Sequence, residues 1–561
     1  MTNHKLLFFV LPALLALDVP CATAFDMNPI QKTLYGEVKG EKTEAGTLFW
    51  KGLPYAKSPA GDLRWKAPQS PTAWKNVRNA TQPATNCIQY SKNGVVGSED
   101  CLNVDIYRPA SKDTLPVLVY IHGGNNQSGN SAEFAPQKLA QDLDAVIVSV
   151  NYRLGVLGFN PLSVLNTGDK LDDSGNYGLL DIAKSLSWVK DNIDNFGGDK
   201  NNITVSGFSA GGRDVMAMLI SPIFRDRFQK AIVFSGGMTT SDKNDSAKVF
   251  AKIFATQVVK DGVKKDDAAA RQWLLSGDKS VRNYLYRQPA PKLAELLGDA
   301  GIRMSVFPHL YRDGYVIPAE GFNTAHYNNV PLLMLSGQNE FSFFALSDKR
   351  FAEAAKNGML RTVPQWVNQF NYTNHYGGKL YSLFNVDDSA KQMYPKYKAN
   401  IYGAEFKFGT DPDVTGDKMA LLGSFHGVFM PFLDSNKYAE FTGDAYKSRG
   451  AQDLGSQFKH YLKNFLLSGN PNGKNLVTWN VWSPTNVKQG ESLLMFDANR
   501  DKALIYMSNK TYRYDDVLHQ MSDDKTVSEA DKKALIGEVL NGRWFSEGLD
   551  AHYHNPSLWV K

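Results

Sequence analysis

The chain has 561 residues, enough to bury a large core, and its length alone allows two to four domains. Hydrophobic residues make up 43% and charged residues 21%, values typical of a soluble globular protein. The net charge of +5 is too small at this length for a nucleic-acid-binding surface, and no lysine- or arginine-rich run is present. Composition therefore argues against a nucleic-acid partner.

Residues 1–24 are predicted to form a signal peptide. His4 and Lys5 give a weakly basic start, Leu6–Leu17 is an apolar run, and Ala22-Thr23-Ala24 supplies the small residues that a signal peptidase reads. The apolar run is too short to cross a bilayer comfortably. We therefore expect cleavage after Ala24, secretion or export to a periplasm, and no membrane span afterwards. An uncleaved anchor is the alternative.

Two cysteines remain once Cys21 has left with the signal peptide. In an oxidising compartment Cys87 and Cys101 are expected to form a disulfide. The chain-entropy argument gives a loop of this size roughly 3 kcal/mol of stabilisation. A pair of free buried thiols is the alternative.

Five short apolar runs are predicted to be buried central strands of a mostly parallel sheet covered by helices, an α/β fold. The strands are Val117–Ile121, Ala145–Val150, Ile203–Ser206, Ala231–Phe234 and Leu332–Leu335. Tyr177–Phe196 has apolar residues at helical spacing and ends at a Gly-Gly pair, a natural stop. No interdomain linker is evident. We predict one domain over residues 25–561, with mainly helical insertions near 240–330 and 345–420.

A glycine-rich loop follows the first of these strands and reads His122-Gly123-Gly124-Asn125-Asn126. Glycines after a strand leave backbone N–H groups bare, and such groups bind the oxyanion of a tetrahedral intermediate. A plain glycine turn is the alternative for this segment taken alone. We interpret His122 as a residue that orders the loop.

The third strand runs into Gly207-Phe208-Ser209-Ala210-Gly211, a G-x-S-x-G pattern, and a helical pattern follows it. This arrangement is typical of a nucleophile elbow, where a serine on a strained strand-to-helix turn needs small neighbours. The helix that follows directs its N-terminus at the oxyanion. The pattern alone is weak, but the strand before it and the helix after it make it much stronger. Ser209 is therefore the candidate nucleophile.

Several separate motifs in order give the sequence a strong resemblance, over roughly residues 35–500, to the type-B carboxylesterase family. That family includes cholinesterases and bile-salt-activated lipase. Besides the elbow, the motifs are Gly52-Leu53-Pro54-Tyr55-Ala56, Glu99-Asp100-Cys101-Leu102-Asn103-Val104, Asn151-Tyr152-Arg153-Leu154-Gly155, Gly175-Asn176-Tyr177-Gly178-Leu179-Leu180-Asp181, Phe196-Gly197-Gly198-Asp199 and Ser468-Gly469-Asn470-Pro471. The resemblance implies an α/β-hydrolase fold with helical insertions forming a cap, and an early disulfide between Cys87 and Cys101.

The resemblance also implies the other members of a catalytic triad. Glu340 stands where the family keeps its triad acid, and His426, within Gly423-Ser424-Phe425-His426-Gly427, matches the catalytic histidine. His426 is expected to act as general base, and Glu340 to orient it. Gly123, Gly124, Asn125 and Ala210 match the oxyanion hole. Other candidates are Asp417 and Asp348 for the acid and His375 for the base; no metal or cofactor is expected.

Several positions near the expected site depart from the family pattern. Asn125 replaces the third glycine of the oxyanion run, and Phe341 replaces the glycine after the triad acid. Phe208, directly before Ser209, and Phe429, three residues past His426, each replace a carboxylate. We expect these phenylalanines to line the site, with a drier floor that selects less for cationic substrates. The alternative is that Phe208 and Phe429 are merely core residues.

The predicted function is that of a secreted serine hydrolase cleaving carboxylic esters of small molecules, with oligomeric state left open. The alternatives are a non-catalytic cholinesterase-like binding protein, or a relative that cleaves lipid esters, amides or carbamates. Towards the C-terminus, Ser528–Leu540 is predicted to be a capped helix. Trp544–Trp559 is predicted to dock on the fold; a metal site at His552 and His554 is the alternative.

Overall fold

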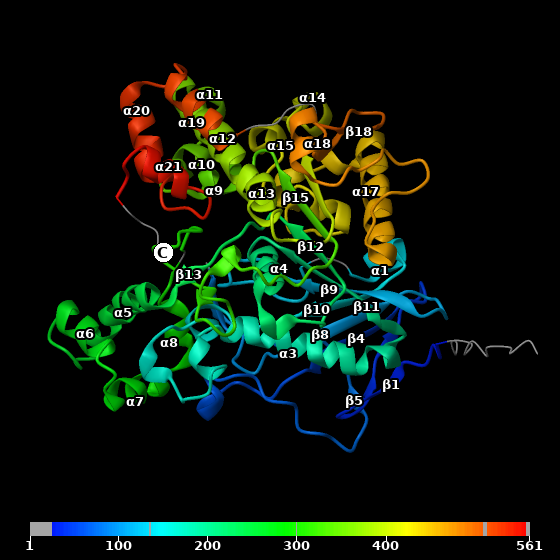
Figure 1. Cartoon of the computed structure of the whole chain (residues 1–561), viewed down its shortest axis with the longest axis vertical. Coiled ribbons are helices and arrows are strands. Elements are labelled where there is room, and N and C mark those ends of the chain that lie inside the picture. The colour runs from blue at the N-terminus through cyan, green and yellow to red at the C-terminus, as the bar shows by residue number, and fades with distance from the viewer. Residues whose placement is uncertain (1–24, 92, 134–135, 299, 509–512, 557–561) are drawn as a thin grey trace, which may run out of the picture.

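A computed structural model describes residues 25–91, 93–133, 136–298, 300–508 and 513–556 (Figure 1). The predicted signal peptide lies outside these residues. Within them, the architecture is a large twisted sheet with helices on both faces and further helices at its edges.

The central sheet has eleven strands among the described residues, in the order β18-β17-β16-β15-β12-β11-β9-β10-β8-β4-β3. Its middle, from β17 to β10, is parallel, and the strands at either edge are antiparallel. The strands are β3 (Glu41–Lys42), β4 (Leu48–Pro54), β8 (Asn103–Arg108), β9 (Leu115–Ile121), β10 (Val146–Val150), β11 (Gly198–Phe208), β12 (Lys230–Phe234), β15 (Leu332–Gly337), β16 (Ile401–Phe406), β17 (Leu493–Ala498) and β18 (Ala503–Met507).

The five predicted strands are confirmed as β9, β10, β11, β12 and β15, which are neighbours in the middle of the sheet. Every residue of β9, β10, β12 and β15 is buried, as strands covered on both faces require. One expectation is corrected. The segment 345–420 is not wholly an insertion, because β16 lies within it and pairs in parallel with β15.

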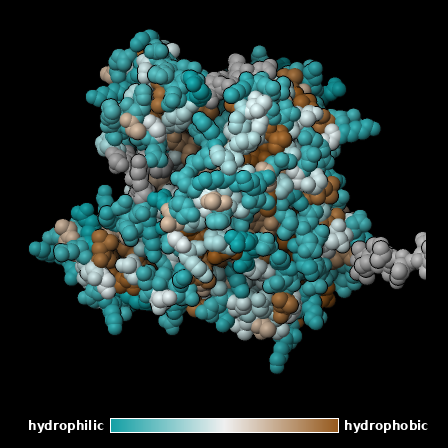
Figure 2. Space-filling view, viewed as in Figure 1, coloured by the Kyte–Doolittle hydropathy of each residue, from teal (hydrophilic) through white to brown (hydrophobic). Residues whose placement is uncertain are grey.

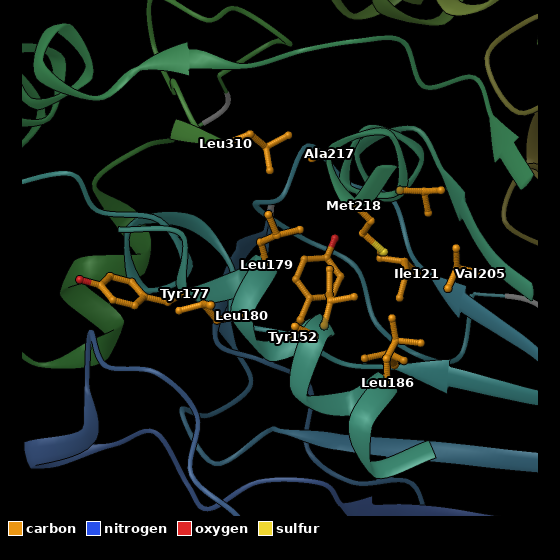
Figure 3. Close-up of a cluster of buried hydrophobic side chains, with 14 of the residues drawn as sticks. Ile121, Tyr152, Tyr177, Leu179, Leu180, Leu186, Val205, Ala217, Met218 and Leu310 are labelled. Atoms are coloured by element: carbon orange, nitrogen blue, oxygen red, sulfur yellow. The ribbon is translucent and has the colours of Figure 1, made fainter. Parts of the chain in front are cut away.

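Helices cover the two faces of the sheet, and β9 shows how the strands divide their side chains between them. Val117, Val119 and Ile121 face a core shared with α3 (Tyr177–Asn192) and α4 (Ala210–Ile220). Leu118 and Tyr120 face a core shared with α1 (Pro136–Leu143) and α17 (Arg449–Ser468). This alternation is the two-residue period of a β-strand. Figure 3 shows the first core, with Met218 of α4 close to Ile121 and Val205.

The predicted helix after residue 177 is confirmed: α3 is followed by a 3₁₀ turn over Ile193–Phe196 and stops at Gly197, whose φ is +72°. The predicted C-terminal helix begins as expected, with Ser528 accepting a hydrogen bond from the Asp531 amide at 3.1 Å. It is the α-helix α20 (Glu529–Ala534), and it continues as a π-helical turn over Leu535–Leu540.

Two groups of helices lie outside the sheet. One group, at the lower left of Figure 1, contains α5 (Lys243–Lys260), α6 (Asp267–Leu274), α7 (Lys279–Arg287) and α8 (Ala290–Glu295). The other, at the upper left, forms the helical lobe, in which two segments far apart in sequence share one core. It contains α9 (Ser342–Ser347), α10 (Ala352–Lys356), α11 (Met359–Thr362), α12 (Pro364–Leu383), α19 (Tyr514–Asp523), α20 and α21 (Glu547–His552).

The face shown in Figure 2 is mostly hydrophilic, with hydrophobic residues in separate patches. Within the described ranges, no helix has both the length and the apolar character needed to cross a bilayer.

Candidate active site

Ser209 sits on a sharp turn between β11 and α4. Its φ and ψ are +57° and −116°, outside the regions that a residue with a side chain ordinarily adopts. The turn is tight enough to dictate its neighbours: a Cβ on Gly207 would lie 2.2 Å from the carbonyl oxygen of Gly211. A strained, glycine-flanked serine between strand and helix has the geometry of a nucleophile elbow.

Glu340 and His426 meet although 86 positions separate them in the chain. Glu340 follows β15, and its Oε2 accepts a short hydrogen bond from Nδ1 of His426. The other carboxylate oxygen, Oε1, accepts hydrogen bonds from Ser235 Oγ at 2.5 Å, Ser336 Oγ at 2.8 Å and the Gly337 amide at 2.6 Å. The carboxylate is fully buried and held by four donors, so the imidazole faces a fixed acceptor.

Sequence reasoning missed Ser235 and Ser336, the two hydroxyls that hold Glu340. Each serine directly follows a predicted strand, at Phe234-Ser235 and Leu335-Ser336. Because parallel strands β12 and β15 are neighbours, their carboxyl ends meet at one edge of the sheet. That position is the signal by which the two serines could have been found.

Ser209 and His426 line one cleft of about 1010 Å³. The imidazole Nε2 is buried and has no hydrogen-bond partner among the described residues. This nitrogen is therefore available to accept a proton. Catalytic hydrogen bonds of unliganded enzymes are often long and tighten in the complex with substrate.

The other candidates for acid and base lie elsewhere. Asp348 lines the cleft, but it forms ion pairs with Arg543 at 2.8 Å and Arg303 at 3.7 Å. Asp417 is exposed at the start of α15 (Asp417–Leu422). His375 lines a separate pocket of about 180 Å³. Glu340 is the acid that contacts His426.

The loop after β9 leaves amides unpaired beside the elbow. Among the described residues, the backbone N–H groups of Gly124, Asn125 and Ala210 donate no hydrogen bond. Gly124 has φ +102°, and a Cβ there would lie 2.1 Å from the Ser128 carbonyl oxygen, so only glycine fits. Gly123 differs from the expectation, because its amide donates to Glu133 Oε2 at 3.4 Å. Three of the four expected donors are thus left for an oxyanion.

His122 is buried and stacks on the ring of Tyr152, with centroids 4.5 Å apart. Its Nδ1 lies 2.8 Å from the Gly123 carbonyl oxygen, and burial lowers the pKa of His122 to about 4. A neutral, stacked imidazole suits a residue that orders the loop.

Of the three phenylalanines expected to line the site, only Phe208 lines the cleft. Its ring centroid lies 4.8 Å from that of His426. Phe429 contacts Phe208 edge-on at 5.5 Å but is fully buried behind it, since it also stacks on Phe234. Phe341 is buried too, at the start of the helical lobe. The expectation that Phe429 and Phe341 line the site is therefore wrong.

Cys87 and Cys101 form a disulfide with Cα atoms 4.9 Å apart. Across the described ranges, no group of three or more histidine, cysteine, aspartate or glutamate side chains is arranged to hold a metal ion. In the C-terminal segment, Trp544 is buried. The end of the predicted docked tail, from residue 557, lies outside the described residues.

Comparison with known proteins gives consistent matches. The family model described as "Carboxylesterase family" matches residues 27–401. Para-nitrobenzyl esterase of Bacillus subtilis (strain 168) is 42% identical over 245 residues, which cover 42% of this chain and about half, 49%, of that relative. Liver carboxylesterase 1 of Oryctolagus cuniculus is 28% identical over 512 residues, covering 80% of this chain and 87% of the relative. A solved structure described as PNB esterase has a TM-score of 0.64 at 27% identity, covering 86% of this chain and 98% of that one.

Proposed function

The chain belongs to the carboxylesterase family, and from this premise we propose that it hydrolyses carboxylic esters through an acyl-enzyme on Ser209. His426 is the general base, and Glu340 orients it. The observation that carries the proposal is the hydrogen bond between Glu340 and His426 at a cleft whose wall also contains Ser209. Three residues far apart in sequence have no other evident reason to converge beside unpaired amides.

In the first half-reaction, Ser209 Oγ attacks the ester carbonyl carbon while its proton passes to His426 Nε2. The carbonyl π electrons move to the oxygen, and the amides of Gly124, Asn125 and Ala210 stabilise the resulting oxyanion. Glu340 holds the Nδ1–H tautomer and stabilises the imidazolium. When the intermediate collapses, the bond to the alcohol oxygen breaks, and Nε2 returns the proton to that oxygen.

In the second half-reaction, water repeats the sequence on the acyl-enzyme. His426 Nε2 takes a proton from the water as its oxygen attacks the acyl carbon. Collapse of the second intermediate breaks the bond to Ser209 Oγ, which regains a proton from the imidazolium. The products are an alcohol, a carboxylic acid and the free enzyme.

The cleft supports small esters with uncharged alcohol groups as substrates. Its wall contains aromatic residues, among them Phe208, Phe343 and Phe344, which offer apolar contact. Phe208 touches the imidazole where relatives carry a carboxylate, which removes one attraction for a cationic group. Asn125, which stands where the family pattern has glycine, lines the same cleft. A series of nitrophenyl esters with acyl chains of different length tests the size of the acyl group that the cleft accepts. A preference for short chains would indicate constriction at Asn125, and a preference for long chains would indicate a lipase-like site.

Covalent labelling of Ser209 tests the mechanism. A fluorescent alkylphosphonate should modify the wild-type protein once, and the Ser209→Ala variant should neither react nor hydrolyse esters. Ser347→Ala, which alters another hydroxyl of the same cleft wall, is the matched control and should keep both activities. Failure of the wild-type protein to react would instead support a non-catalytic binding role. Turnover of amides or carbamates but not esters would support the other alternative.

We further propose that the protein is exported to the periplasm or secreted. The Cys87–Cys101 disulfide supports this, because disulfides persist in oxidising compartments. N-terminal sequencing of the extracellular or periplasmic protein should begin at Phe25. Recovery of the full-length chain in the cytosol would refute the proposal.

A further inference from the structure

Arg213 is a buried cation in the first turn of α4, four residues after Ser209. Its side chain is fully buried, and its backbone amide donates to the Ser209 carbonyl oxygen at 3.0 Å. The indole ring of Trp544 covers the guanidinium, with 3.2 Å between the guanidinium carbon and the ring centroid. The residue therefore belongs to the same turn as the proposed nucleophile.

The guanidinium is poorly compensated. Within the described residues, Arg213 forms no salt bridge, and its Nε and Nη1 have no hydrogen-bond partner. Burial lowers the pKa of Arg213 to about 10, so the group stays protonated at neutral pH. A buried cation without a carboxylate costs free energy, and a protein that keeps one needs a reason.

The adjacent carboxylate of Asp214 compensates the charge of Arg213 only in part. Asp214 directs its Oδ1 to Asn126 Nδ2 at 2.9 Å, away from a salt bridge with Arg213. Burial also raises the pKa of Asp214 to about 7, so the carboxyl group is only partly ionised at neutral pH. Asp214 therefore attracts the guanidinium and raises its pKa, but it forms no ion pair with it and offsets the burial of the charge only in part.

In the described part of the chain, the polar side chain that bonds to the guanidinium is Asn125. Arg213 Nη2 lies 3.4 Å from Asn125 Oδ1, at the long end of the hydrogen-bond range. The other end of the same side chain donates from Nδ2 to Gln127 Oε1 at 2.8 Å. The side-chain amide of Asn125 is therefore held at both its oxygen and its nitrogen.

Asn125 needs such support because of its backbone. Its φ is +57°, the left-handed region that asparagine tolerates better than most residues but less well than glycine. This is the position where the family pattern has glycine. The residue lines the cleft, and its backbone N–H has no acceptor among the described residues. An oxyanion donor is effective only if its direction is fixed before the charge develops.

We propose that Arg213 is a positioning residue for the oxyanion hole: held under Trp544, it fixes Asn125 so that the Asn125 amide points at the developing oxyanion. The inference rests on the proposed function. It also gives the C-terminal segment a role, since Trp544 lies in sequence between the π-helical turn over Leu535–Leu540 and α21. In Figure 1, α21 belongs to the red part of the helical lobe. A residue 331 positions beyond Arg213 thereby supports the proposed oxyanion site.

The test compares Arg213→Met and Arg213→Lys with the wild-type protein in ester hydrolysis. Arg213→Met should lower kcat about tenfold or more, in the range of a weakened oxyanion donor, with KM changed less than about twofold. It should weaken binding of an aryl trifluoromethyl ketone, which forms an anionic adduct on serine, by a similar factor. Arg213→Lys should recover part of both losses, because an ammonium retains a donor and the charge.

A double-mutant cycle tests the route through Asn125. Asn125→Gly should lower kcat modestly, and adding Arg213→Met to it should then have little further effect. Fully additive losses would overturn the proposal. So would an Arg213→Met variant whose kcat and inhibitor affinity match the wild-type protein.

Folding is checked separately with Arg108→Met. Arg108 is another buried arginine stacked on an aromatic ring, Phe25, and it bonds only to carbonyl oxygens away from the cleft. This control should lower Tm with kcat unchanged. If Arg213→Met behaves in the same way, Arg213 is structural. Phosphonate labelling of Ser209 in the wild-type protein reports on the proposed function independently, so the two failures are distinguishable.

Discussion

Replacing Glu340 with glutamine should nearly abolish activity, because the protein's own hydrogen bonds force the new amide into the wrong orientation. In the native site, Oε1 faces three donors: the hydroxyls of Ser235 and Ser336 and the amide of Gly337. A glutamine must place its oxygen there. Its NH2 group then faces His426 Nδ1, which becomes an acceptor. The imidazole proton is driven to Nε2, the atom that must take the proton of Ser209.

The magnitude follows from the alternative orientation. Turning the amide round would leave the buried Gly337 N–H facing another donor, which costs about 1–3 kcal/mol. The productive tautomer would then be populated only about one part in ten to one in a hundred. Loss of the negative charge that stabilises the imidazolium adds to this, so we expect kcat to fall by about 10³–10⁴ in total.

The assay is steady-state hydrolysis of a nitrophenyl ester across pH 6–9, with Tm measured in parallel. KM should change little, since Glu340 is buried behind His426 and does not line the cleft. Ser235→Ala removes one donor and keeps the charge, so it should cost far less than Glu340→Gln. A folded Glu340→Gln enzyme with more than a tenth of wild-type kcat would refute the reasoning.

Three further predictions concern specificity, pH and stability. Phe208→Glu should raise the ratio of kcat/KM for a choline ester over its uncharged isostere, because the new carboxylate would lie beside His426; an unchanged ratio would contradict this. Burial raises the pKa of Asp214 in the folded state to about 7, above the value of about 3.9 in the unfolded chain. Between these two pH values the folded state binds one more proton than the unfolded state, so the free energy of unfolding falls as pH rises from about 4 to about 7. Asp214→Asn should therefore narrow the difference in Tm between pH 5 and pH 8, and an equal or wider difference would exclude this linkage. Replacing Cys87 and Cys101 with serine should lower the free energy of unfolding in urea by about 3 kcal/mol, and reductant should then have no further effect.

The strands that could be predicted from the sequence are those formed by consecutive apolar residues. Strand β9 is an uninterrupted apolar run, so its burial on both faces follows from composition alone. Strand β8 is equally buried but contains Asp105 and Arg108. Asp105 accepts hydrogen bonds from the Gly52 amide and Ser131 Oγ, and Arg108 donates to Gly197. These three partners lie 26 to 89 positions away along the chain, and no local pattern reveals them.

The candidate site shows the same difference between features that adjacent residues reveal and features that depend on distant residues. The elbow at Ser209 and the glycine run at Gly124 are backbone requirements, which leave a signature in adjacent residues, and both lie where the sequence predicts. The residues that orient the reacting groups depend on contacts between distant parts of the chain. Ser235 donates a hydrogen bond to Glu340, 105 positions away, and Trp544 covers Arg213. A motif can therefore identify the reacting atoms of an esterase while remaining silent on what fixes their direction. If direction rather than identity sets kcat here, the largest effects outside the triad should come from residues such as Arg213 that no motif contains.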